Sequence, residues 1–507
     1  MEWFLYISYV LVLLSLAGYG FHRLTIIYLY LKHKDDVPVA KGHFDELPVI
    51  TMQLPVFNEL HVAERLIQKV AEIDYPKDKL HIQVLDDSTD ETKEICREQV
   101  ADLVSRGFDA ECIHRSDRTG YKAGALENGI KSAKGEYLFI LDADFVPNAD
   151  VLQKTIHYFT DDKVGMIQTR WGHLNRNYNV LTRIQAMFLD GHLELEQTAR
   201  NRSGRFFTFN GTGGMWRKSC IADAGGWEHD TLTEDMDLSY RAQLKGWNFV
   251  FLKDVESPAE LPVDMDGFKS QQHRWTKGSI QCCKKCLKNI WKSDAPLKAK
   301  MEATAHLTSN FAYLALIVLC FLIYPKQLTN IPLIVENPML EYCINIPIFF
   351  FGSVSVALFY LTAQKALHPK TWLKEIIYLP LLIALGIGMS VNNAKAVLEA
   401  LFNHESGFVR TPKYGIDKAG AGGEKQSVGW KSSKYKAMKS VTPLIEFAFG
   451  VFFLIVVISN YADANFATAI LLTPFPIGFF FTSIPSLKRM FAGFVKNSVE
   501  ESIDSGK

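Results

Sequence analysis

The stretch His81-Ile82-Gln83-Val84-Leu85-Asp86-Asp87-Ser88-Thr89-Asp90 joins a short apolar run to an acidic end. Such a run is typical of a buried strand, and Asp, Ser and Thr suit the turn that follows it. Similar runs occur at 48–55 and 137–141, and they are separated by helix-like stretches at about 59–73 and up to about residue 106. Strands that alternate with helices predict an α/β fold with a parallel, doubly wound sheet.

Carboxylates follow two of these predicted strands. Asp86 and Asp87 come after the second run, and Asp142 and Asp144 come directly after the third. In open α/β sheets, ligands bind at the carboxyl ends of the strands. Two carboxylates one residue apart offer the oxygen ligands that suit Mg²⁺ or Mn²⁺ bridging a diphosphate. Aspartates that only form turns give the same pattern, so the pair alone leaves both interpretations open.

The segment Gly120-Tyr121-Lys122-Ala123-Gly124-Ala125-Leu126 lies between these acidic clusters. Its small residues let a ligand approach the backbone, and Lys122 offers a positive charge for a phosphate. An ordinary helix start explains the segment equally well.

Two further motifs carry residue types suited to sugar transfer. Residues 233–237 (Thr-Glu-Asp-Met-Asp) place three carboxylates within four residues, and 271–275 (Gln-Gln-His-Arg-Trp) set a guanidinium beside an indole. A carboxylate can take a proton from a hydroxyl, an arginine can hold a phosphate through two hydrogen bonds, and a tryptophan can stack on a sugar ring. Helix capping by the acidic residues and simple packing of the Arg-Trp pair are the alternatives.

Charge and composition bound the class of protein. The chain has 507 residues with 55 Lys and Arg against 55 Asp and Glu, so no net field attracts nucleic acid. Residues 3–20 are almost free of charge, and Arg23, Lys32 and Lys34 follow them. This order indicates an uncleaved membrane anchor at 1–31 with the next domain in the cytosol. The eight cysteines form no disulfide framework, and Cys283-x-x-Cys286 lacks the second ligand pair of a zinc site.

The C-terminal part predicts a membrane bundle over 301–487. Apolar stretches lie at about 303–325, 343–363, 376–391, 441–459 and 466–486, and a basic amphipathic stretch at 284–300 predicts a helix on the membrane surface. Residues 376–391 are short, contain Pro380, Gly386 and Gly388, and have basic flanks on both sides. A full crossing there conflicts with the positive-inside rule. We therefore expect a re-entrant or interfacial segment, and about five spans including the anchor.

The motifs become specific when they are taken in order. Asp86-Asp87, Asp142-x-Asp144, Thr233-Glu234-Asp235 and Gln271-x-x-Arg274-Trp275 resemble the D, DxD, TED, QxxRW series of processive family 2 glycosyltransferases, the cellulose synthase superfamily. The resemblance covers about residues 46–290. The sequences of residues 120–126 (GYKAGAL), 209–214 (FNGTGG) and 234–247 (EDMDLSYRAQLKGW) are most similar to those of the cellulose-synthase-like A and C groups. It implies a cytosolic glycosyltransferase-A-type domain, parallel-dominated, inserted between transmembrane helices.

The resemblance also implies a role for each matching residue. Nucleotide and diphosphate of the donor would be bound by Asn58, Glu59, Asp86, Asp87, Lys122, Asp142, Gln271 and Arg274, with Asp142 and Asp144 holding Mg²⁺ or Mn²⁺. Asp235, beside Glu234, would be the general base. Trp275, Asn210 and Trp171 would contact the acceptor. Cellulose synthases typically have a cysteine where this chain has Asn210, which argues against a glucan acceptor.

The implied function is an inverting hexosyltransferase that polymerises a β-1,4-linked mannan, glucomannan or glucan from GDP-mannose, GDP-glucose or UDP-glucose. Its partners would be the growing polysaccharide, the lipid bilayer and export subunits, with no nucleic acid. Loop 404–440 resembles the gating loop of cellulose synthases, and the tail 488–507 is too short for a cyclic-dinucleotide-binding domain. We favour a bacterial inner membrane, with a Golgi membrane as the alternative. Transfer to a lipid acceptor and a nucleotide-gated transporter are the competing hypotheses.

Overall fold

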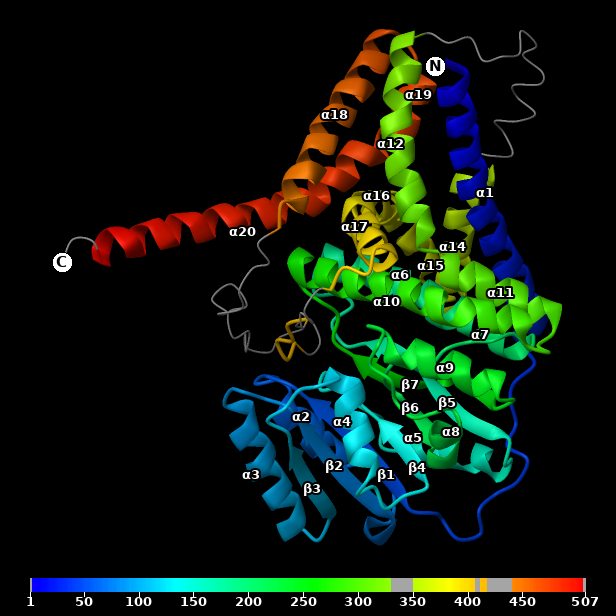
Figure 1. Ribbon diagram of the computed structural model, residues 1–507, viewed down its shortest axis with the longest axis vertical. Coiled ribbons are helices and arrows are strands. Elements are labelled where there is room, and N and C mark those ends of the chain that lie inside the picture. The colour runs from blue at the N-terminus through cyan, green and yellow to red at the C-terminus, as the bar shows by residue number, and fades with distance from the viewer. Residues whose placement is uncertain (1, 330–349, 406–410, 417–439, 505–507) are drawn as a thin grey trace.

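The computed structural model describes residues 2–329, 350–405, 411–416 and 440–504. In this part of the chain, a mixed seven-stranded sheet with its helices forms one end of the molecule, and long apolar helices form the other (Figure 1). The helices α6 and α10 lie between the two ends (Figure 1). The chain starts in the apolar end with α1 (Glu2–His33), builds the sheet, and returns to the apolar end after α10.

The sheet has the strand order β3-β2-β1-β4-β6-β5-β7. All neighbouring strands are parallel except β6, which runs antiparallel to both β4 and β5. The carboxyl ends of the other six strands therefore meet at one edge. The strands are β1 (Ile50–Val56), β2 (Leu80–Asp86), β3 (Asp109–His114), β4 (Tyr137–Ile140), β5 (Val164–His173), β6 (Gly214–Arg217) and β7 (Asn248–Ala259).

Helices cover both faces of the sheet. Those of this domain are α2 (Ala63–Val70), α3 (Thr92–Ser105), α4 (Tyr121–Ile130), α5 (Val151–Ile156), α6 (Val180–Asp190), the π-helix η3 (Gly191–Glu196), α7 (Gln197–Arg202), α8 (Lys218–Asp223), α9 (Glu234–Leu244) and α10 (Met265–Lys292), with short 3-10 turns η1 (Lys77–Lys79) and η2 (His157–Thr160). This double coverage explains the continuous apolar runs. In β4, Phe139 packs into the core on one face while Leu138 and Ile140 pack into the core on the other.

The α/β fold and its mostly parallel sheet agree with the prediction. The three predicted strands appear as β1, β2 and β4, each within two residues of the expected bounds, whereas the helix expected over 59–73 is shorter and forms α2. The antiparallel β6 was not predicted, because its four residues follow the glycine-rich segment 209–213 and carry no distinct periodicity. The seven described cysteines are all free, as expected for this part of the chain.

The apolar end consists of helices after α10. They are α11 (Leu297–Thr308), α12 (Phe311–Thr329), the π-helix η4 (Phe350–Val354), α14 (Ser355–Leu367), α15 (Trp372–Glu375), the 3-10 turn η5 (Ile376–Tyr378), α16 (Leu379–Gly388), α17 (Ser390–Leu401), α18 (Thr442–Ala462), α19 (Phe466–Leu472) and α20 (Pro474–Asp504). Residues 343–349 of one predicted span lie outside the described residues.

Four helical runs in the described part are long and apolar enough to cross a membrane. They are Ile7–His33, Trp372–Leu401, Thr442–Ala462 and Phe466–Ala492. The pair Leu297–Thr308 and Phe311–Leu322, bent by 52°, makes a fifth if it is one span. The run Trp372–Leu401 contains the segment 376–391, which is therefore helical. The re-entrant or interfacial placement of this segment stays a prediction.

The single amphipathic helix predicted over 284–300 is wrong in its bounds. Helix α10 ends at Lys292, and α11 begins at Leu297 after Pro296. Proline has no N–H to continue the first helix and suits the position just before the second. The exposed Trp291, Leu297 and Met301 flank this break.

A buried ion pair joins the two ends of the molecule. Lys269 of α10 donates to Glu446 of α18 over 2.5 Å between Nζ and Oε2, and the two residues are only 7% and 0% exposed. Burial of either charge without the other costs far more than burial of the pair. The pair therefore fixes α10 against α18.

Glu446→Leu leaves the buried Lys269 ammonium without its carboxylate partner. We expect this substitution to lower the free energy of unfolding by about 3–5 kcal/mol. The double variant Lys269→Met/Glu446→Leu removes both charges and should recover most of this loss. Thermal unfolding of the full chain in detergent measures both effects. A single variant that melts like the unaltered protein contradicts the role given to the pair.

Candidate active site

One pocket lies at the carboxyl edge of the sheet. It is lined by the ends of β1, β2, β4, β5 and β7, by the segment 210–212, by the start of α9 and by the first half of α10. The predicted site residues come from motifs spread between residues 58 and 275, and all but Asn58 and Asp86 line this pocket. The tertiary structure therefore brings twelve of the fourteen together.

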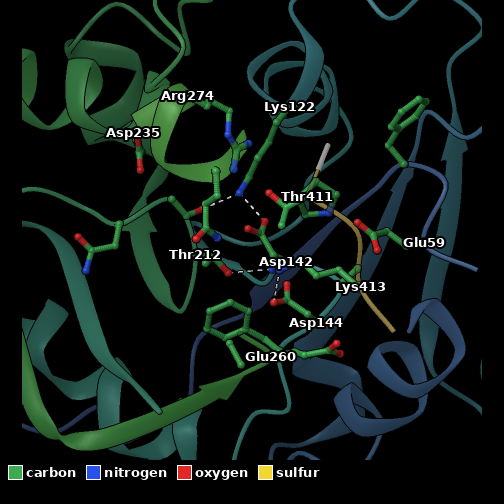
Figure 2. Close-up of a pocket in the computed structure, with 18 of the residues that line it drawn as sticks. Glu59, Lys122, Asp142, Asp144, Thr212, Asp235, Glu260, Arg274, Thr411 and Lys413 are labelled. Atoms are coloured by element: carbon green, nitrogen blue, oxygen red, sulfur yellow. Dashed lines mark hydrogen bonds and ion pairs between the residues drawn. The ribbon is translucent and has the colours of Figure 1, made fainter. Parts of the chain in front are cut away.

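The two aspartates after β4 lie at the centre of the pocket (Figure 2). The backbone N–H of Asp142 donates to Thr212 Oγ1 at 2.8 Å, which fixes the start of the turn. Lys122 Nζ donates to the Asp142 carboxylate and, at 2.9 Å, to the carbonyl of Gly211. Lys413 forms an ion pair with the buried Asp144. Each carboxylate of the pair is thus neutralised by one lysine.

The donor set at this position fits a divalent cation. Two carboxylates project from one turn, and hard oxygen ligands are those that Mg²⁺ and Mn²⁺ prefer. The ammonium groups of Lys122 and Lys413 contact these carboxylates, so positive charge is already favoured there. Asp142 and Asp144 are therefore the residues that could hold the predicted metal.

Asp235 lies near Arg274 and Lys122 on one side of the pocket (Figure 2). It sits in the first turn of α9, where its Oδ1 accepts the backbone N–H of Met236 at 2.8 Å. Burial first, and then the charge of Glu234, raise the pKa of Asp235 to about 7, against the lowering effects of the Met236 N–H, Lys122 and Arg274. A carboxylate with such a pKa is a better proton acceptor at neutral pH than an ordinary one.

The glycine-rich segment 209–214 holds these groups together. Gly211 has φ of +82°, and a Cβ there would lie 3.0 Å from Asp235 Oδ2 and 3.8 Å from Lys122 Nζ. Only glycine adopts this backbone region freely and leaves room for the carboxylate. The indole N–H of Trp171 donates to the carbonyl of Thr212 at 3.1 Å. The segment therefore hydrogen-bonds to Asp142 and Lys122 and lies close to Asp235, the predicted base.

The residues predicted to contact the acceptor surround the same segment. Trp275 lies 6.5 Å from Trp171 between ring centroids, at 50°. The Oδ1 of Asn210 accepts from Gln197 Nε2 at 2.8 Å, and its backbone N–H donates to Gln168 Oε1 at 2.9 Å. Because the carboxamide oxygen faces Gln197, the NH₂ group of Asn210 is the part left for a ligand.

Asn58 and Asp86 are the two predicted residues that do not line the pocket. Asn58 adopts φ of 54° and bonds to Thr89, with its Oδ1 accepting the Thr89 N–H at 2.8 Å. Asp86 is fully buried, and its carboxylate contacts His114 Nδ1 at 2.6 Å and the Ser88 N–H at 2.9 Å. Both shape the loop that presents Asp87. Their direct contact with a nucleotide stays a prediction.

Several residues in the pocket or next to it were not predicted from the sequence. Arg115, next to the pocket, binds Asp87 through two hydrogen bonds of 2.8 and 2.6 Å. Arg118 lines the pocket, and its guanidinium lies 3.3 Å from the centroid of the Phe57 ring. Both arginines come shortly before the segment 120–126, which was the available signal for them. Glu260 and His173 also line the pocket, and no local pattern marks either residue.

Residues 411–416 of the predicted gating-like loop reach the pocket, and residues 406–410 and 417–439 of it lie outside the described residues. Thr411 and Lys413 line the cavity. The carboxylate of Glu260 accepts the backbone N–H groups of Tyr414, Gly415 and Ile416 at 3.0, 2.9 and 3.2 Å. Burial raises the pKa of Glu260, and the Tyr414 N–H and Lys413 oppose this. The resemblance to a gating loop stays a prediction.

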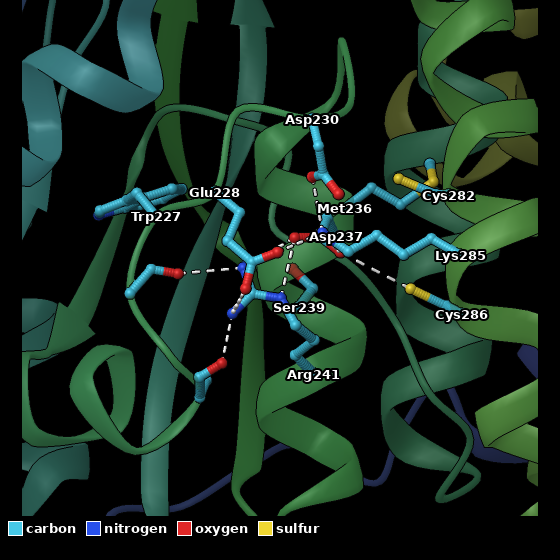
Figure 3. Close-up of polar contacts among 12 residues, drawn as sticks. Trp227, Glu228, Asp230, Met236, Asp237, Ser239, Arg241, Cys282, Lys285 and Cys286 are labelled. Carbon is cyan, nitrogen blue, oxygen red and sulfur yellow. Dashed lines mark hydrogen bonds and ion pairs between the residues drawn. The ribbon is translucent and has the colours of Figure 1, made fainter. Parts of the chain in front are cut away.

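A second acidic cluster has a structural role. Glu228, Asp230 and Asp237 bring their carboxylate oxygens within 4.8 Å of one another, close enough for a metal ion (Figure 3). Lys285 Nζ, however, contacts them at 2.5, 2.6 and 3.1 Å. Arg241 also binds the fully buried Asp237 at 2.7 Å. These contacts hold α9 against α10 and so place Asp235 near Arg274.

A family match covers the part of the chain that builds the sheet and the pocket. Residues 48–278 match the family described as glycosyltransferase like family 2, and this part of the chain is a domain of that family. The resemblance predicted from the motifs is therefore confirmed.

Among known proteins, the chain is similar to two plant enzymes. It is 38% identical to glucomannan 4-beta-mannosyltransferase 1 of Oryza sativa subsp. japonica over 322 residues, 62% of this chain and 61% of that protein. It is 37% identical to probable glucomannan 4-beta-mannosyltransferase 10 of Arabidopsis thaliana over 301 residues, 58% of this chain and 53% of that protein. The matched region thus spans about three fifths of the length of the curated relatives.

The fold is shared with a solved structure, mannosyltransferase PcManGT from Pyrobaculum calidifontis in complex with GDP-Man and Mn²⁺. The TM-score is 0.52 at 19% identity, covering 78% of this chain and 100% of that one. At this identity the likeness supports the glycosyltransferase fold.

Gly211→Ala should lower glycosyl transfer at least about 10-fold, because the new Cβ lies 3.0 Å from Asp235 Oδ2 and crowds that carboxylate. Gly107→Ala is the matched control, since Gly107 has the same φ of +82° and nothing lies within 4 Å of its Cβ position. Both variants should lose similar stability, about 1–2 kcal/mol. Equal transfer by the two variants would show that the close approach at Gly211 has no catalytic importance.

Proposed function

We propose that this protein is a membrane-embedded, inverting hexosyltransferase that polymerises a β-1,4-linked mannan or glucomannan backbone from a nucleotide sugar. The observation that carries the proposal is the meeting of the DxD, TED and QxxRW residues in one pocket beside Lys122. Two similar plant proteins bear the name glucomannan 4-beta-mannosyltransferase, one of them as probable, which favours mannose as the transferred sugar.

GDP-mannose is the donor we favour, with GDP-glucose and UDP-glucose as the alternatives. The solved structure with the same fold was obtained with GDP-Man, which supports this choice. The diphosphate of such a donor needs compensating charge, and Lys122 and Arg274, which both line the pocket, would supply it. Asp87 and Arg118 line the same cavity, and we expect them to contact the nucleoside.

Transfer is a direct displacement at the anomeric carbon. The acceptor hydroxyl oxygen forms the new bond to that carbon, the bond to the diphosphate oxygen breaks, and the hydroxyl proton passes to Asp235. The raised pKa of Asp235, about 7, makes its carboxylate a stronger proton acceptor than that of an ordinary aspartate. Attack opposite the leaving group inverts the configuration from α to β.

Asp142 and Asp144 would hold Mg²⁺ or Mn²⁺ beside the diphosphate. The bound cation supplies positive charge that stabilises the departing diphosphate. Before it binds, Lys122 and Lys413 neutralise these two carboxylates. With a cation on these carboxylates, the Lys122 ammonium would be available to a phosphate of the donor.

The acceptor chain would lie against Trp171 and Trp275, whose rings provide an apolar surface for a sugar. Asn210 offers its NH₂ group to a sugar hydroxyl. We expect the helices after α10 to lead the growing chain away from the pocket, as in a processive enzyme that lies in a membrane with its catalytic domain on the cytosolic side. A bacterial inner membrane remains our prediction, with a Golgi membrane as the alternative, and export subunits would be partners.

The test is incorporation of radiolabelled sugar by the purified full chain in liposomes, with each of the three donors offered separately and with Mg²⁺ or Mn²⁺. We expect ethanol-insoluble polymer from GDP-mannose, digestible by β-mannanase and abolished in Asp235→Asn. Lipid-extractable product supports transfer to a lipid acceptor instead. Nucleotide binding without turnover supports the transporter hypothesis, in which Asp235→Asn should have no effect.

The pH dependence of transfer should report the pKa of Asp235. Because the base must be ionised, the rate should rise with pH through about 7. Glu234→Gln removes a negative charge that raises this pKa, so the acidic limb of the kcat/KM profile should move to lower pH. Glu98→Gln, which removes an exposed carboxylate of α3 outside the pocket, is the control and should leave the limb in place. An unmoved limb in Glu234→Gln argues against Asp235 as the titrating base.

A further inference from the structure

His173 is a pocket residue that the mechanism above does not use. It is the last residue of β5, two positions after Trp171, and it lines the same cavity. Its side chain is only 6% exposed, and its Nε2 lies 3.0 Å from Asp190 Oδ1. A nearly buried imidazole beside a buried carboxylate has one nitrogen fixed and the other left for a ligand.

Asp190 is held as a carboxylate. Its Oδ2 accepts from Arg176 at 2.7 Å and from Gln364 at 2.9 Å, which leaves Oδ1 for His173. Burial raises the pKa of Asp190, but the hydrogen bond from His173 and the positive charge of Arg176 hold that pKa well below its usual range. Since an ionised carboxylate only accepts hydrogen bonds, Nε2 of His173 carries the hydrogen.

The charges around Asp190 balance without a charge on His173. Glu375 binds Arg183, with 3.0 Å between Oε2 and Nε, and lies 3.6 Å from Arg176. Two carboxylates therefore face two guanidinium groups. A neutral His173 with hydrogen on Nε2 has a lone pair on Nδ1, and among the described residues that atom has no hydrogen-bond partner.

We propose that His173 is an acceptor-binding residue whose Nδ1 accepts a hydrogen bond from a sugar hydroxyl, and that Asp190 is the residue that positions it. This inference rests on the proposed function. A lone pair suits a hydroxyl donor and repels a diphosphate, which offers only acceptors. The position next to Trp171 and the link through Gln364 to α14 place His173 toward the apolar end of the molecule, where the growing chain would leave.

The geometry also explains what kind of discrimination His173 would provide. Asn210 presents hydrogen-bond donors to the pocket, and His173 presents an acceptor. A sugar whose hydroxyls match both groups is bound better than an epimer that matches one, because an unmatched polar group in a buried site is costly. His173 thus contributes to the choice between acceptor sugars.

Two substitutions separate the two nitrogens of His173. In His173→Gln the side-chain amide can still donate to Asp190, but the Nδ1 lone pair is lost. In His173→Asn the shorter carboxamide can place an oxygen near the position of Nδ1. We expect His173→Gln to raise the KM for β-1,4-mannotetraose about 10-fold with little change in kcat, and His173→Asn to recover part of this loss.

His81→Gln is the control. It replaces another buried imidazole that lies beside a carboxylate, 3.3 Å from Glu111, on β2 and outside the pocket. Its KM for mannotetraose should match that of the unaltered protein. Isothermal titration with GDP and with Mn²⁺ completes the comparison, and both affinities should be the same in all variants. A residue with a merely structural role would shift these affinities and kcat together with KM.

The outcomes separate this inference from the proposed function. An unchanged KM in His173→Gln overturns the inference alone. Weaker Mn²⁺ binding in His173→Gln makes the imidazole a metal ligand and also overturns it. If the unaltered full chain transfers sugar from none of the three donors to mannotetraose, the proposed function fails, and the inference fails with it.

Discussion

The close approach of the backbone at Gly211 to two charged side chains is the constraint on which the site depends. The left-handed conformation of this residue turns its carbonyl to Lys122 and leaves space for the Asp235 carboxylate, while Thr212 fixes the turn that carries Asp142. A Cβ at this position would lie 3.0 Å from Asp235 Oδ2, so a side chain here would crowd that carboxylate. The glycine-rich segment is therefore the part around which motifs from four distant stretches are assembled.

Electrostatics explains why so many acidic residues can share one cavity. Asp142 and Asp144 each contact a lysine, and Asp87 is paired with Arg115. Asp235 differs, because the charge of Glu234 and burial outweigh the positive groups near it, so its pKa is raised to about 7. Neutralised carboxylates can exchange their partner for a cation, whereas an unneutralised one is suited to take a proton.

Buried polar clusters connect the catalytic domain to the apolar helices. Arg200 of α7 and His22 of α1 both bind Glu302 of α11, Arg176 and Asp190 reach Gln364 of α14, and Lys269 of α10 binds Glu446 of α18. Such groups are tolerated only when each has its partner. They fix the pocket relative to the apolar helices.

The sequence by itself determined the α/β class, the three strands β1, β2 and β4, and most of the candidate site. These follow from local signals: an apolar run that ends in acidic residues is visible over ten positions, and four motifs in order are specific. Asn58 and Asp86 belong to the predicted motifs as well, yet they do not line the pocket and instead contact Thr89 and His114. A motif identifies a loop, but it does not give the direction of each side chain.

Only the tertiary structure decided the antiparallel β6, the break between α10 and α11, and the pocket residues His173, Glu260 and Arg118. His173 matters through Asp190, which is seventeen positions away, and Glu260 through backbone groups about 155 positions away. Contacts of this kind depend on how strands and helices pack, and a single sequence carries no local pattern for them. The sequence was therefore enough to predict the chemistry of the motifs, whereas the orientation of their side chains depended on the tertiary structure.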